Sequence, residues 1–113
     1  MTTIRIVKAA GKWTVRAGGA VIAETTHALE LSEGDLAPVI YFPRGDVAMA
    51  FLEPSATTRT CPYKGDAQYF SIEAKNRTLT DAVWSFEAPK EAAARIAGHL
   101  AFTPGDYLTV EQA

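Results

Sequence analysis

Residues 13–25 contain two alternating segments separated by two glycines, a pattern that few structures other than a β-hairpin accommodate. In residues 13–17 (Trp-Thr-Val-Arg-Ala) apolar and polar side chains alternate, as they do in a strand with one buried face. Gly18 and Gly19 can adopt the positive φ angles of a tight two-residue turn, and residues 20–25 then return as a second strand. Residues 13–25 therefore predict a β-hairpin, and we expect the rest of the chain to consist mainly of strands as well.

Similar short segments bounded by turn residues recur along the chain. The run Val-Ile-Tyr-Phe at 39–42 is β-branched and aromatic and stops at Pro43, as expected of a buried strand. About eight short strands at regular spacing are typical of a compact, partly open sheet or a barrel-like arrangement. We expect the other strands at 4–8, 28–31, 67–73, 82–86, 100–102 and 107–110.

One short helix is predicted in the second half of the chain, over residues 89–97. Pro89 suits the first position of a helix, where a missing N–H costs nothing. Three alanines follow at 92–94, and alanine is the strongest helix former. Gly98 can end the helix in a left-handed conformation. The expected fold is therefore mainly β with this single helix.

The segment 47–52 allows two interpretations. Asp46 could cap a short helical turn there, because its carboxylate can accept hydrogen bonds from unpaired backbone N–H groups. The alternation of Val47, Met49 and Phe51 fits a strand equally well. The sequence pattern leaves both open.

The length of 113 residues corresponds to one ordinary domain. No linker, repeat or low-complexity stretch interrupts the sequence, so we expect a single domain over 1–113. A domain of this size buries about two thirds of the surface of its unfolded chain. That is sufficient for a core without disulfides or a structural metal.

The charge distribution argues against two classes of partner. The formal net charge is −2, with 11 basic residues scattered among 13 acidic ones. Nucleic-acid binding needs a basic surface that neutralises phosphates, and binding to an anionic membrane needs a polybasic segment. We therefore expect no nucleic-acid or membrane partner. The single cysteine, Cys61, fits a reducing compartment, and residues 4–8 are too charged for a signal peptide, so we expect a cytoplasmic protein.

The densest set of reactive side chains lies in the turn sequence Cys-Pro-Tyr-Lys-Gly at 61–65. Pro62 and Gly65 favour a turn, which can bring Cys61 and Lys64 together, and a nearby ammonium favours the nucleophilic thiolate. The alternative is a small packed thiol beside a solvated lysine. The candidate catalytic residues are Cys61, Lys64 and Asp46.

A metal site is not expected from this sequence. Its soft ligands are Cys61, His27 and His99, with no Cys-x-x-Cys pair and no closely spaced histidines. A zinc site would require these distant residues to converge. We expect no metal and no cofactor.

Aromatic residues concentrate in the central strands. Alternation places Trp84 and Phe86 on one face of the strand 82–86. If that face lines a concavity beside Tyr63 and Lys64, it forms an apolar pocket with a few polar anchors. The alternative is that these rings belong to the hydrophobic core.

A series of motifs in a fixed order covers nearly the whole chain: Tyr41-Phe42-Pro43, Asp46-Val47, Cys61-Pro62-Tyr63-Lys64-Gly65, Trp84-Ser85-Phe86 and Ala97-Gly98. Together they resemble the DUF427 family. The resemblance implies a small all-β protein with a complex, partly open sheet, similar to the Mss4-like architecture. The family carries a nucleotidyltransferase label without an established biochemical role.

The residues do not by themselves support nucleotidyl transfer. That reaction usually needs clustered carboxylates that hold Mg²⁺ against phosphates, and Asp46, Asp66 and Asp81 are dispersed along the chain. The paired cysteines of Mss4-like zinc proteins are also absent. Phe86 stands where the family more often has Tyr, which puts in doubt a proton-transfer role at this position.

Two hypotheses of function remain. In the first, the domain binds a small molecule in a pocket near the turn 61–65, with Lys64 and Arg44 placed to hold an anionic group and Asp46 or Cys61 placed to act as base or nucleophile. The ligand-binding residues would be Tyr41, Arg44, Tyr63, Lys64 and Trp84. In the second, the same motifs form turns and core, and the domain serves protein interaction or structure without catalysis. No catalytic spacing in the sequence decides whether the chain is an enzyme.

Overall fold

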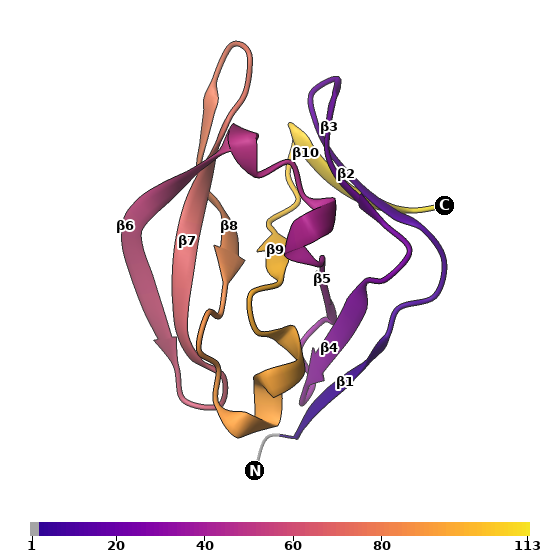
Figure 1. The fold of residues 1–113 in the computed structure, drawn as a ribbon, viewed down its shortest axis with the longest axis vertical. Coiled ribbons are helices and arrows are strands. Elements are labelled where there is room, and N and C mark those ends of the chain that lie inside the picture. The colour runs from indigo at the N-terminus through magenta and orange to yellow at the C-terminus, as the bar shows by residue number, and fades with distance from the viewer. Residues whose placement is uncertain (1–2) are drawn as a thin grey trace.

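The computed structural model describes residues 3–113 and consists mainly of strands (Figure 1). Within these residues no helix is long and apolar enough to cross a membrane. In chain order the strands (β) and 3₁₀ helices (η) are β1 (Ile4–Lys8), β2 (Trp13–Ala17), β3 (Ala20–Thr25), β4 (Leu29–Glu33), β5 (Val39–Tyr41), η1 (Arg44–Asp46), η2 (Met49–Phe51), β6 (Leu52–Cys61), β7 (Gly65–Glu73), β8 (Thr78–Ser85), η3 (Glu91–Ile96), β9 (Leu100–Phe102) and β10 (Leu108–Gln112).

The strands form three open, antiparallel sheets. Their orders are β1-β4-β5, β10-β2-β3 and β6-β7-β8-β9. None of these sheets closes into a barrel within the described part of the chain. The prediction of a mainly β, partly open fold is confirmed.

The first hairpin is built as the two glycines predict. Ala17 pairs with Ala20, so Gly18 and Gly19 form the two-residue turn between β2 and β3. Gly18 has a φ of +61°, whereas Gly19 lies outside the left-handed region. A Cβ atom on Gly18 would also lie 2.4 Å from Oη of Tyr107. Glycine is therefore required at the first turn position for both conformation and space.

Gly18→Ala is expected to lower the free energy of unfolding by about 2 kcal/mol, because alanine is strained in the left-handed region and its methyl group meets Tyr107. Gly19→Ala is the matched control, since no atom lies within 4 Å of its added Cβ. This control should change stability by less than about 0.5 kcal/mol. Urea unfolding of the two variants tests the difference, and equal midpoints would contradict it.

Two of the three sheets meet edge to edge at β5 and β9. The backbone N–H of Phe42 donates to the carbonyl of Leu100 at 2.8 Å, and the N–H of Leu100 donates back to Phe42 at 2.9 Å. Figure 1 shows β9 beside β5, between the two groups of strands. The strands β1-β4-β5 and β9-β8-β7-β6 therefore form one bent surface with two faces.

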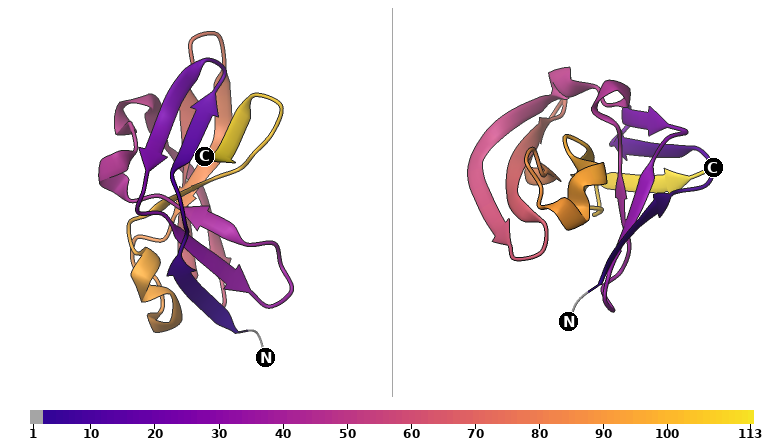
Figure 2. Two further views of the ribbon diagram at one scale, coloured as in Figure 1. Left: turned by 90° about the vertical axis from the view of Figure 1, so that its right-hand side faces the viewer. Right: turned by 60° about the horizontal axis from the view of Figure 1, so that its bottom comes forward.

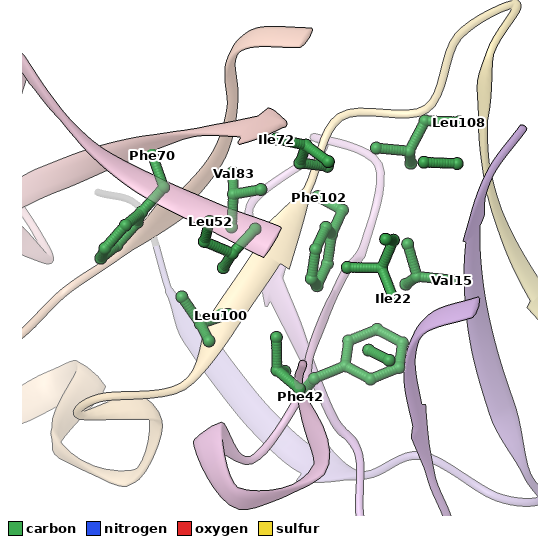
Figure 3. Close-up of a cluster of buried hydrophobic side chains, with 13 residues drawn as sticks. Val15, Ile22, Phe42, Leu52, Phe70, Ile72, Val83, Leu100, Phe102 and Leu108 are labelled. Carbon is green, nitrogen blue, oxygen red and sulfur yellow. The ribbon is translucent and has the colours of Figure 1, made fainter. Parts of the chain in front are cut away.

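The first face packs against the remaining sheet, β10-β2-β3. Because side chains alternate along a strand, β9 sends Leu100 and Phe102 to this side and Ala101 to the other. The rings of Phe42 and Phe102 meet edge to face, with their centroids 5.5 Å apart. Figure 3 shows how the side chains of this larger core interdigitate.

The second face carries a smaller core that η3 covers in part. Ala93 and Ile96 of η3 are fully buried against it, and Arg95 Nη1 donates to the carbonyl of Ile6 in β1 at 2.6 Å. Figure 2 shows η3 at the same end of the molecule as β1, and the two elements contact each other. The rest of this face is left for a cavity.

The helix expected at 89–97 is a shorter 3₁₀ segment, interrupted at Ala93 by a φ of −118° and a ψ of 20°. Both ends of the connection are held by neighbouring segments. The N–H of Lys90 donates to Lys64 at 2.9 Å, and the N–H of Gly98 donates to Phe86 at 3.1 Å. The two anchors and the non-helical backbone at Ala93 accompany a 3₁₀ segment in place of the expected regular helix. Gly98 has a φ of +71°, as predicted for the residue that ends the helix.

The longest strand, β6, is absent from the expected set. Its sequence is polar and includes Pro54, which hides the usual strand pattern. β6 lies at the edge of its sheet, where proline and polar side chains are tolerated. Of the two interpretations of the segment 47–52, the Asp46 cap is not found, because η2 has Ala48 at its N-cap and no side-chain cap hydrogen bond. Asp46 Oδ2 instead accepts a hydrogen bond from Thr25 Oγ1 at 2.7 Å. Within the segment 47–52, only Met49–Phe51 (η2) are helical, and β6 begins at Leu52.

Candidate functional site

A cavity of about 440 Å³ opens on the second face, between β4 and β5 on one side and β6, β7 and β8 on the other. Most of the lining residues lie two apart in the sequence, because such residues of a strand point to the same face. A connecting segment adds Leu36 and Ala37 at the rim. The lining residues are Leu31, Glu33, Leu36, Ala37, Val39, Tyr41, Arg59, Thr60, Cys61, Pro62, Lys64, Ala67, Tyr69, Trp84 and Phe86.

Tyr41 and Trp84 form a hydrogen-bonded pair in the wall of the cavity. Trp84 Nε1 donates to the Tyr41 hydroxyl at 3.2 Å. Burial raises the pKa of Tyr41 to about 12, against the opposing effect of the Trp84 hydrogen bond, and negative charge at Cys61 and Glu33 adds to the rise. Among residues 3–113, the Tyr41 hydroxyl makes no hydrogen bond besides the one that it accepts from Trp84. Tyr41 is thus a neutral donor that the cavity leaves free.

Tyr41→Phe is expected to change the stability of the protein at high pH. The folded protein holds the Tyr41 proton up to a pKa of about 12, whereas the unfolded chain releases it near about pH 10. Between these values the unfolded chain binds fewer protons, so the free energy of unfolding falls by about 1.4 kcal/mol per pH unit. This contribution is fully present below about pH 10 and is lost as the pH rises to about 12.

Urea unfolding at several pH values in this window measures the effect. Wild-type protein should lose stability more steeply than Tyr41→Phe. Tyr63→Phe is the matched control, because the Tyr63 side chain is 43% exposed and the variant should follow wild type. Parallel curves for wild type and Tyr41→Phe would contradict the expectation.

Lys64 and Glu33 form an ion pair inside the cavity. Lys64 Nζ binds Oε1 of Glu33, and their side chains are only 15% and 11% exposed, respectively. The Lys64 ammonium also lies 5.8 Å from the centroid of the Phe86 ring. Glu33 compensates the charge of Lys64, so the lysine does not present a free cation to the cavity.

The turn that carries Lys64 is held by the connection before η3. Gly65 is buried with a φ of +106°, and its backbone packs beside Ala88 and Lys90. Lys90 Nζ donates to the carbonyl of Pro62 at 2.7 Å. A side chain at Gly65 would be strained in this conformation. The glycine therefore allows the turn to aim Lys64 toward Glu33.

Arg59 and Tyr69 continue the cavity wall along β6 and β7. The Arg59 guanidinium lies 5.9 Å from the centroid of the Tyr69 ring. The Tyr69 and Trp84 rings lie 6.3 Å apart, with an angle of 35° between their planes. Two aromatic faces and one guanidinium therefore stand together at this side of the cavity.

Four of the residues proposed from sequence lie together here, namely Tyr41, Cys61, Lys64 and Trp84. Cys61 is partly exposed at the end of β6. Tyr63 belongs to the same turn but is exposed and does not line the cavity. The alternation predicted for β8 is confirmed, since Trp84 and Phe86 share this face.

Arg44 and Asp46 lie elsewhere. Arg44 Nε donates to the carbonyl of Gly98 at 3.1 Å, and its guanidinium pairs with Glu87. Asp46 is held by Thr25, as described above. The structure therefore does not bring Arg44 and Asp46 to the cavity with the other four proposed residues.

Residues 5–112 match the model of a protein family described as a domain of unknown function (DUF427). The chain belongs to the DUF427 family. No curated protein gives a significant match to it. Membership in DUF427 carries no stated activity, so the interpretation of the site depends on its own residues.

The acidic residues of this DUF427 domain do not gather at a point. Asp66 accepts a hydrogen bond from Thr60 at 2.8 Å, while Asp46 and Asp81 lie in η1 and β8. Among the residues that the structure describes, no three of His, Cys, Asp and Glu are placed to hold a metal ion. The carboxylate cluster typical of nucleotidyl transfer is not found among the described side chains.

Glu33, Arg59 and Tyr69 line the DUF427 cavity but were not among the candidate site residues from sequence. Glu33 follows Leu31 by two positions, and β4 extends to include it. Arg59 precedes Cys61 by two positions in β6. For Glu33 and Arg59 the signal was the two-residue spacing of side chains on one face, which can be used only when the segment is known to be a strand.

Proposed function

We propose that this protein binds a small molecule in the cavity beside the turn 61–65. The observation that carries the proposal is the convergence of Tyr41 from β5, Cys61 and Lys64 from the turn 61–65 and Trp84 from β8 on one cavity of about 440 Å³. A concave, mainly apolar site with a few polar groups is typical of ligand binding. The aromatic walls suit a flat apolar body, and the polar groups suit an anionic substituent.

The Trp84 indole is a direct probe of this proposal. Its N–H donates to Tyr41 inside the cavity, whereas the Trp13 indole N–H donates to the carbonyl of Ala10 elsewhere. In ¹H–¹⁵N NMR spectra, a cavity ligand should shift the Trp84 indole signal and leave the Trp13 signal in place. Trp13→Phe assigns the two signals.

The single cysteine provides the blocking experiment. Cys61 lines the cavity, so a bulky maleimide adduct on Cys61 should abolish the response of Trp84 to ligands found in a metabolite screen. Cys61→Ser treated with the same reagent is the matched control and should still respond. If no ligand shifts the Trp84 signal, or if the adduct leaves binding unchanged, the proposal fails and the protein-interaction hypothesis takes its place.

A further inference from the structure

We propose that the cavity takes a flat aromatic ligand that carries a carboxylate or phosphate group, and that Arg59 rather than Lys64 binds this anionic group. The inference rests on the proposed function, since it requires that the cavity binds a small molecule. It assigns a ligand class and an anchoring residue that the sequence motifs did not indicate. Three features of the structure carry it.

The first feature is the difference between the two cations of the cavity. Lys64 is bound to Glu33, and both side chains are largely buried, so an incoming anion would have to compete with a carboxylate already in place. Arg59 makes no ion pair within the described part of the chain. The pair is neutral as a whole, and Arg59 gives the cavity its one net positive charge.

The position of Arg59 next to Asp81 does not change this conclusion. Hydroxyl groups of Ser55 and Thr57 are the main reason that the pKa of Asp81 is below its usual value, and the charge of Arg59 contributes to a smaller extent. The two charged groups do not come within ion-pair distance. The guanidinium of Arg59 keeps its hydrogen-bond donors for a ligand.

The second feature is the aromatic wall beside Arg59. The guanidinium lies 5.9 Å from the centroid of the Tyr69 ring, within cation–π distance, and its planar donors can bind a carboxylate or phosphate in a bidentate way. Tyr69 and Trp84 present neighbouring ring faces, with centroids 6.3 Å apart. A flat ring against these faces gains contact area and stacking.

The third feature is the free hydroxyl hydrogen of Tyr41. Trp84 Nε1 already donates to the Tyr41 oxygen, which leaves the phenol to act as a donor. Like any tyrosine, Tyr41 is neutral around physiological pH, because even an unperturbed phenol has a pKa of about 10. A ligand with an acceptor on its ring or substituent satisfies this donor, and a purely hydrocarbon body leaves it without a partner.

The test uses four probes of similar shape: 2-naphthoate, 2-naphthyl phosphate, the neutral 2-naphthamide and the non-aromatic decalin-2-carboxylate. Dissociation constants are measured from the Trp84 indole signal. We expect at least one of the two aromatic anions to bind about tenfold more tightly than 2-naphthamide and decalin-2-carboxylate, as for hydrogen bonds to charged groups. Comparison of the carboxylate with the phosphate identifies the preferred anion.

Arg59→Gln should weaken binding of the preferred aromatic anion about tenfold while leaving 2-naphthamide affinity unchanged. Arg77→Gln is the matched control, because Arg77 also lies over a tyrosine ring, Tyr107, at 4.2 Å. It precedes β8 at the β7–β8 turn, at the far end of the sheet from the turn 61–65 (Figure 1). Its removal should not affect binding of any probe.

Each contrary result has a distinct meaning. If 2-naphthamide binds as tightly as the aromatic anions, the cavity binds ligands but the anionic class is overturned. If decalin-2-carboxylate matches 2-naphthoate, the aromatic class is overturned. If the double variant Glu33→Gln/Lys64→Gln loses as much anion affinity as Arg59→Gln, the assignment to Arg59 is overturned. If no probe shifts Trp84, this inference fails, and the metabolite screen with the Cys61 adduct decides the proposed function separately.

Discussion

Phe42→Ala is expected to lower the free energy of unfolding by about 4 kcal/mol, the loss typical of a buried phenylalanine. Phe42 is 0% exposed, and its ring packs edge to face on Phe102. Its backbone also makes both hydrogen bonds that join β5 to β9. Truncation therefore opens a void in the larger core at the joint between two sheets. Equilibrium unfolding in urea measures the loss.

A matched control distinguishes the effect of losing a buried phenyl ring from the effect of losing an exposed one. Phe51 is 39% exposed in η2, and Phe51→Ala should cost less than about 1 kcal/mol. Phe42→Leu should recover part of the stability, because it returns apolar volume to the void. Equal unfolding midpoints for Phe42→Ala and Phe51→Ala would show that the joint does not depend on this ring.

The second large effect is expected at the ion pair in the cavity. Lys64→Gln leaves the carboxylate of Glu33 without its partner in a site where both side chains are at most 15% exposed. Removing one partner of a buried ion pair lowers the free energy of unfolding by about 3 kcal/mol or more, because the charge of the other partner stays buried without compensation. Glu33→Gln should cost a similar amount for the same reason. Both losses are measured by urea unfolding near neutral pH.

The double variant Glu33→Gln/Lys64→Gln should regain most of the stability, since it leaves no buried charge and the two amides can bind each other. The exposed pair of Lys12 and Glu24 is the matched control. Its atoms are 3.4 Å apart, but its side chains are 51% and 49% exposed, so Lys12→Gln should cost less than about 1 kcal/mol. A double variant as unstable as the two single losses added together would exclude the pairing.

Much of the fold follows from local patterns in the sequence. The direction of a side chain in a strand depends only on whether its position is odd or even. For this reason the shared face of Trp84 and Phe86 could be predicted without knowing any neighbouring strand. The turn at Gly18 and Gly19 was predictable on similar grounds, because the conformation of a two-residue turn depends on the residues inside it.

Two elements depended on the surroundings instead. β6 is an edge strand with a polar sequence and a proline. It is a strand because its backbone pairs with β7, and its own residue pattern does not predict this pairing. The segment 91–96 has good helix formers, but both ends of its connection are tied to other segments. Weak intrinsic preferences yield to such tertiary constraints.

The sequence by itself determined the mainly β fold, the turn at 61–65 and the concentration of reactive side chains around it. Only the tertiary structure decided what those side chains do to one another. Trp84 and Tyr41 are 43 positions apart, and Lys64 and Glu33 are 31 apart. Which charge meets which partner depends on strand order and register across the bent surface, and neither is encoded in the local spacing of residues. The pairing of Lys64 and the freedom of Arg59 are consequences of that arrangement.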